Sequence, residues 1–194
     1  MYGCSRTILA MFSRTLVFAV GLLAPTGLAT DITDFTIVNR VQFSVPANWS
    51  VIADTSTSEK TVFAFQIPNV ADEGTPDSSN LSIIVTDLKT DQDREVFQKQ
   101  VPPNQSAQVK KLVEGWDCST FSAFQHSSKT QYVIWDCRRI VADCGVSVRI
   151  AWPHLPKNTP DYDDQMEMVL SNFLTSVGPF KTVPKSGVLR RSVN

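Results

Sequence analysis

The sequence is poor in the residues that most catalytic and cofactor-binding motifs require. It has two histidines, His126 and His154, and eight glycines, none in a Gly-x-Gly-x-x-Gly array. Such an array lets a backbone loop approach the phosphates of a dinucleotide, so no cofactor is predicted. Ser127, His154 and Asp161 can be written as a catalytic triad, but no nucleophile-elbow or oxyanion-hole sequence accompanies them. We therefore predict no catalytic, cofactor-binding or metal-binding residue.

Basic charge and long apolar runs are also scarce. The chain has 18 Lys and Arg against 19 Asp and Glu, and it is 42% hydrophobic and 19% charged. Without an excess of basic residues, the chain has no broad positive electrostatic potential to attract nucleic acid, so no nucleic-acid partner is predicted. The composition also excludes a disordered tail, a collagen and a coiled coil.

The most apolar run covers residues 15–23 (TLVFAVGLL) and is followed by small residues at Gly27 and Ala29. This is the pattern of a secretory signal peptide, so residues 1–29 are predicted to be removed by cleavage before Thr30. The run is shorter than the roughly 20 helical residues that span a bilayer, which makes a retained anchor the less favoured alternative. We expect a periplasmic or secreted protein, with no membrane insertion of the mature chain.

Removing residues 1–29 from the 194 leaves 165, which suits a single domain. The sequence leaves Met1 and Met11 open as alternative starts. Residues 181–194 contain four basic residues and no acid, and they predict a flexible basic tail. The remaining domain, residues 30–180, then has a net charge of −7.

Three cysteines remain after signal removal: Cys118, Cys137 and Cys144. Cys118 and Cys137 lie on two strand-like segments joined by a turn, which puts both side chains on one face of a hairpin, within disulfide reach. We predict a Cys118–Cys137 bridge, as an oxidising compartment favours. Cys144 lies in the next turn, separated from Cys137 by extended residues, and its state stays open between a buried free thiol, an intermolecular bridge and a nucleophile.

Alternation of apolar and polar residues predicts a series of strands. They cover residues 41–45, 61–67, 81–88, 109–113, 116–125, 131–141 and 146–152. The adjacent pair Ile83 and Ile84 points to opposite faces of its strand, which indicates cover on both sides of the sheet.

Two helices are predicted from their caps and periodicity. The first covers residues 91–100, with Thr90 as N-cap and acidic residues in its first turn. The second begins at Pro160 behind the cap Thr159, repeats apolar residues at three- and four-residue steps, and ends at Gly178. This second helix is amphipathic and is expected to cover one face of the sheet.

The order of these elements resembles the PsbP-like superfamily, which includes the extrinsic photosystem subunit and exported bacterial proteins of the DcrB type. The best local match is VQFSVPANW at residues 41–49, which is similar to that group's opening segment of apolar strand, Pro, small residue and Trp. The resemblance covers about residues 35–180. It implies an α+β fold, mostly antiparallel β-sheet with helices on both faces (an α/β/α sandwich), and a binding, chaperone or adaptor role. No functional residue carries over.

Four charged residues are the predicted interface: Asp136, Arg138, Arg139 and Arg149. The first three lie in mid-strand, and the period of two puts Arg138 on the same face as Asp136. Two interpretations stay open. The set is either a charged binding surface or a solvated face with a cross-strand ion pair worth under about 1 kcal/mol.

Together these observations favour an exported, non-enzymatic binding or accessory protein with a protein partner. An immunity or inhibitor protein is a specific version, and the acidic body favours a basic partner. One alternative is a small secreted hydrolase that uses His154 with an acid or Cys144. The other is a self-assembling structural protein of the cell envelope.

Overall fold

The computed structural model describes residues 31–37, 40–68, 79–100, 108–110, 115–127, 129–154, 160–181 and 190–193. The predicted signal peptide, residues 1–29, lies outside the described residues. Its removal and the division of the chain at residues 30 and 180 stay predictions.

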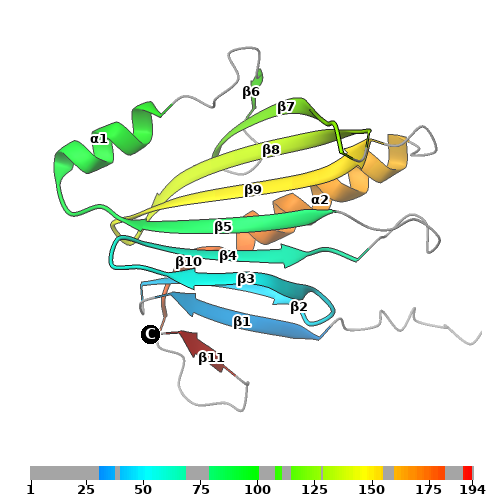
Figure 1. The fold of residues 1–194 in the computed structure, drawn as a ribbon. Coiled ribbons are helices and arrows are strands. Elements are labelled where there is room, and N and C mark those ends of the chain that lie inside the picture. Colours follow the sequence, from blue (N-terminus) through cyan, green and yellow to red (C-terminus); the bar gives the residue numbers. More distant parts are fainter. Residues whose placement is uncertain are drawn as a thin grey trace, which may run out of the picture.

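Seven strands form the larger sheet, in the order β3-β4-β5-β9-β8-β7-β6, and all neighbours are antiparallel (Figure 1). The strands are β3 (Ser50–Ser56), β4 (Lys60–Gln66), β5 (Asn80–Asp87), β6 (Gln108–Lys110), β7 (Asp117–Gln125), β8 (Thr130–Val141) and β9 (Cys144–His154). On β9, Val146, Val148, Ile150 and Trp152 are all at most 1% exposed. The alternation in the sequence therefore marks the core face of this strand.

A smaller sheet has the order β10-β2-β1-β11. Its strands are β1 (Ile32–Ile37), β2 (Val41–Pro46), β10 (Gly178–Pro179) and β11 (Arg190–Val193). The β1–β2 pair is antiparallel, whereas β1 and β11 are parallel. β11 lies within the segment that the sequence predicts as a basic tail, so the backbone of these four residues joins the sheet.

The two helices begin where the sequence places them. α1 (Asp91–Lys99) starts with a capping box, in which the Thr90 hydroxyl accepts from the amide of Asp93 and the Asp93 carboxylate accepts from the amide of Thr90. α2 (Pro160–Ser176) buries its apolar residues in the core. Its buried side chains are Tyr162, Met166, Leu170, Phe173 and Leu174.

An aromatic cluster joins the two sheets. Phe35 and Phe43 of the smaller sheet stack at 5.3 Å between ring centroids, and Phe63 of the larger sheet meets Phe35 edge to face at 5.4 Å. All three rings are at most 4% exposed, and each buried Phe stabilises the fold by about 1.5–3 kcal/mol. Trp49, in the turn after β2, lies 6.4 Å from Phe173 of α2 and extends the cluster to the helix.

The structure describes all three cysteines of the predicted mature chain. Cys118 and Cys137 lie opposite each other on β7 and β8 and form a fully buried disulfide, which confirms the predicted pairing. Cys144 is a buried free thiol. Burial is the main cause that raises its pKa, so the thiolate is disfavoured.

The fold is α+β and mostly antiparallel, as predicted. α2 lies on the core face of the larger sheet, and Phe97 of α1 reaches the opposite face. Cover on that opposite face is partial, since Ile83 is fully buried but its neighbour Ile84 is half-buried. In the part of the chain that the structure describes, no helix has both the length and the apolar character needed to cross a membrane.

Candidate functional site

The face of the larger sheet that turns away from α2 carries three of the four predicted charged residues, and we call it the outer face. Strand register brings Ser82, Arg149, Asp136 and Ser119 side by side across β5, β9, β8 and β7. The next row holds Ile84, Ser147, Arg138 and Asp117. Three of these eight side chains are serines, and two are the arginines Arg138 and Arg149.

Asp136 and Arg149 form a bidentate ion pair across β8 and β9. The Arg149 Nε donates to Asp136 Oδ1 at 2.7 Å and Nη2 donates to Oδ2 at 2.8 Å. The Asp136 side chain is only 10% exposed and that of Arg149 is 50% exposed. The hydrogen bond from Arg149 to Asp136 is the main cause that raises the pKa of the guanidinium. This paired geometry holds Arg149 in one orientation on the outer face.

Arg138 is held differently. Its Nη1 donates to the backbone carbonyl of Gln100, the residue that caps the C-terminus of α1. Because the acceptor is a carbonyl, the positive charge of Arg138 has no anionic partner in this contact. Arg139 has another environment, with its guanidinium carbon 5.9 Å from the centroid of the buried Trp116 ring. Asp136, Arg138 and Arg149 thus line one cavity, whereas Arg139 lines a second cavity with Asp136 and Arg138.

α1 rests on the outer face through one side chain. Phe97 is the buried residue of this helix, and its ring lies against Gly145 of β9. A Cβ atom at position 145 would come within 2.7 Å of the ring, so only glycine leaves room for this contact. No local sequence pattern predicts this pairing.

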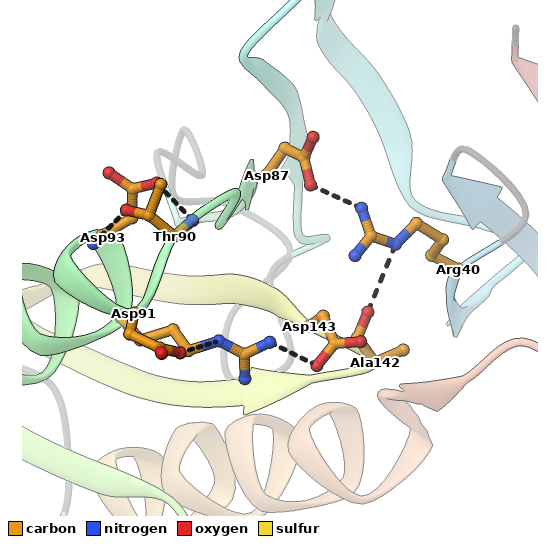
Figure 2. Close-up of polar contacts among 8 residues, drawn as sticks. Arg40, Asp87, Thr90, Asp91, Asp93, Ala142 and Asp143 are labelled. Carbon is orange, nitrogen blue, oxygen red and sulfur yellow. Dashed lines mark hydrogen bonds and ion pairs between the residues drawn. The ribbon is translucent and has the colours of Figure 1, made fainter.

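Arg94 of α1 and Arg40, the residue before β2, both contact the β8–β9 turn (Figure 2). Arg94 of α1 donates to Asp143 at 2.6 Å, and Arg40 donates to Asp87 at 2.5 Å and to the carbonyl of Ala142 at 3.3 Å. Ala142 and Asp143 have φ values of 48° and 66°, as a two-residue hairpin turn requires. The hydrogen bond from Arg94 lowers the pKa of Asp143, and the bond to Asp87 raises the pKa of Arg40.

Two cavities flank α1 on the outer face. The larger, of about 650 Å³, lies between the helix and strands β4, β5, β9 and β8, and we call it the outer-face groove. Its charged lining residues are Glu59, Lys60, Asp87, Lys89, Asp93, Asp136, Arg138 and Arg149. The smaller, of about 480 Å³, shares Phe97, Asp136 and Arg138 with the groove and adds Asp117. Three of the four predicted interface residues thus line one groove.

A third cavity, of about 380 Å³, lies between the β2–β3 turn and α2. Trp49, Phe173 and Val169 line it together with the exposed Ile32. The cavity depends on how α2 packs, so no sequence pattern predicts it.

The residues considered for catalysis do not assemble into a triad. The Nδ1 of His154 lies 3.9 Å from Asp163 Oδ2, while the other oxygen of Asp163 accepts from the indole of Trp152 at 2.7 Å. Within the described residues, His154 makes no hydrogen bond to Ser127 or Asp161, and no group of three His, Cys, Asp or Glu side chains is placed to hold a metal ion. A hydrolase therefore finds no support in the geometry around His154.

Comparisons with protein-family models and with curated proteins find no match. Among solved structures, a protein of Bacteroides thetaiotaomicron VPI-5482 is similar with 15% identity and a TM-score of 0.48, over 77% of this chain and 49% of that one. This chain thus spans about half the length of that protein. A point mutant of Mog1 has 10% identity and a TM-score of 0.48, over 78% of this chain and 97% of Mog1.

LpqN of Mycobacterium tuberculosis, described as involved in cell-envelope biogenesis, has 12% identity and a TM-score of 0.40, over 80% of this chain and 88% of LpqN. Membership of the PsbP-like superfamily stays a prediction.

Proposed function

We propose that this chain is an exported, non-enzymatic binding or accessory protein that recognises a protein partner through the outer-face groove. An immunity or inhibitor role is a specific form of this proposal. The observation that carries it is the placement of Asp136, Arg138 and Arg149 along one open groove beside α1.

The two arginines are held before any partner arrives. Asp136 holds the Arg149 guanidinium by two hydrogen bonds, and the carbonyl of Gln100 holds Arg138. Arginine is enriched at protein interfaces, and a side chain that is already ordered loses less conformational entropy on binding. The groove is therefore better suited to recognition than a face of freely rotating charges.

The proposed export rests on two independent features. The apolar run at residues 15–23 precedes a signal-peptidase pattern. The Cys118–Cys137 disulfide is fully buried, and disulfides persist mainly in oxidising compartments.

The test is a cross-linking pull-down with the mature chain, residues 30–194, from the native envelope or medium. The chain is compared with Arg138→Ala and with Lys181→Ala, a control at an exposed lysine outside the groove. We expect a protein that cross-links to β8 or β9, that is lost with Arg138→Ala and that is kept with Lys181→Ala. Repeated failure to recover such a protein, or equal recovery with both variants, contradicts the proposal.

A further inference from the structure

Two of the four acids that line the outer-face groove are paired with arginines within the chain. Asp136 is paired with Arg149, and Asp87 is paired with Arg40. The carboxylate of Asp93 accepts from the Thr90 amide in the capping box, and its hydrogen bonds with Thr90 are the main causes that lower its pKa. Of the acids that line the groove, Glu59 and Asp93 form no ion pair among the described residues.

The basic residues of the same groove are mostly uncommitted. In the described part of the chain, neither Lys60 nor Lys89 forms an ion pair, and both are exposed. Arg138 donates to a carbonyl, so its charge is not neutralised there. An incoming carboxylate would meet three cationic donors, whereas an incoming ammonium would meet the two acids Glu59 and Asp93. Asp117, the remaining acid near Arg138, lines the smaller cavity on the other flank of α1.

We infer that the outer-face groove binds an acidic segment of a protein partner, with its carboxylates on Lys60, Lys89 and Arg138. This inference rests on the proposed function and names the chemistry of its partner. The net charge of −7 over residues 30–180 favours a basic partner, but net charge averages the whole surface. Within about 10 Å, roughly one Debye length, the local charges decide which ligand is attracted.

The floor of the groove suits an extended segment. Ser82, Thr86 and Ser147 provide hydroxyls along it, and Ile84 provides an apolar patch between them. Hydroxyls both donate and accept, so they can bond the backbone of a bound chain of any sequence. The selectivity for acid therefore comes from the cations at the sides of the groove.

The probe is hexaglutamate, added to the isotope-labelled mature chain and followed by amide chemical shifts in NMR. Hexalysine and a neutral hexapeptide of Ser and Gly are the controls. We expect saturable shifts at amides of β4, β5, β8 and β9 with hexaglutamate alone, and weaker binding in 0.5 M NaCl than at low salt. Equal or tighter binding of hexalysine, or shifts that map away from the groove, overturns the inference.

Substitutions of charged residues in the groove give a second test, because removing a cation should weaken hexaglutamate binding and removing an acid should strengthen it. Lys60→Gln and Lys89→Gln should each weaken hexaglutamate binding roughly two- to fivefold, the range of exposed ion pairs. Glu59→Gln should strengthen it, and Lys181→Gln, outside the groove, should leave it unchanged. If Glu59→Gln weakens binding, the groove selects cations and the inference is wrong. All four side chains are exposed, so the folded state is retained, as unfolding midpoints verify.

This inference and the proposed function fail in distinguishable ways. A partner that depends on Arg138 but binds through a non-acidic segment overturns the acid preference and leaves the proposed function in place. Hexaglutamate bound in the groove, without any protein partner recovered, overturns the proposed function and leaves the charge preference in place.

Discussion

Phe97 of α1 packs against Gly145 of β9 so closely that a Cβ atom at position 145 would come within 2.7 Å of its ring. This contact holds α1 against the sheet, and the other residues of the helix are largely exposed. The position of α1, and with it the walls of both cavities on the outer face, therefore depends on the absence of a side chain at residue 145.

Gly145→Ala is expected to destabilise the protein by about 1–3 kcal/mol, the usual cost of forcing extra volume into a packed contact. Chemical denaturation measures the free energy of unfolding. Gly178→Ala is the matched control, because nothing lies within 4 Å of a Cβ at that position. Equal effects of the two substitutions would show that the Phe97 contact does not matter. Gly145→Ala should also shift the NMR signals of α1.

The disulfide is expected to contribute about 3 kcal/mol, the entropic estimate for a closed loop of this size, since 19 residues separate its cysteines. A Cys118→Ala, Cys137→Ala double variant should unfold at correspondingly lower denaturant concentration. Cys144→Ala is the control that removes a thiol without removing a bridge. The native mature chain, residues 30–194, should show no thiol reactive to a labelling reagent, and the denatured mature chain should show the thiol of Cys144. Rapid labelling of the native protein would contradict the buried placement.

Whether the sequence predicts a strand depends on how much of that strand is buried in the core. β2, β5, β8 and β9 have one face in the core, so their alternation is visible in the sequence. β3 is missed because it is an edge strand with every residue exposed, which leaves no apolar period. β10 has two residues and β11 four, and both owe their strand conformation to pairing with β2 and β1.

The candidate site, like the fold, is only partly predictable from the sequence. That Asp136 and Arg138 share a face follows from the strand period, and the structure shows both on the outer face. Arg139 does not line the outer-face groove, and the sequence does not show that Trp116 is its neighbour in space. The contact of Arg138 with the Gln100 carbonyl joins residues 38 positions apart. Such contacts follow from packing and have no local signature.

The ion pair between Arg94 and Asp143 predicts a pH dependence of stability. Arg94 lowers the pKa of Asp143 in the folded state. The pair therefore stabilises the fold at pH values above the unfolded pKa of Asp, about 3.9, and the benefit is lost as the pH falls through the lower folded pKa. Unfolding midpoints from pH 7 to pH 2 measure this loss.

Asp143→Asn is the variant for that experiment, because Asn tolerates the positive φ of 66° at this position. It should be less stable than wild type at pH 7, and the difference should shrink below about pH 4. Asp54→Asn, at an exposed aspartate of β3 that forms no ion pair among the described residues, is the control. A constant difference between wild type and Asp143→Asn at every pH would exclude the pair as its cause.

A hydrolase screen tests the main alternative to a binding role. His154 is exposed, and the nearest acid, Asp163, already accepts from Trp152. A general base needs hydrogen-bond reach to its nucleophile and an orienting group, and the described residues give His154 neither. We expect wild type and His154→Ala to show equal or absent activity on ester, peptide and glycoside substrates. Hydrolysis by wild type that disappears in His154→Ala, while the variant keeps its unfolding midpoint, would overturn the proposed non-enzymatic role.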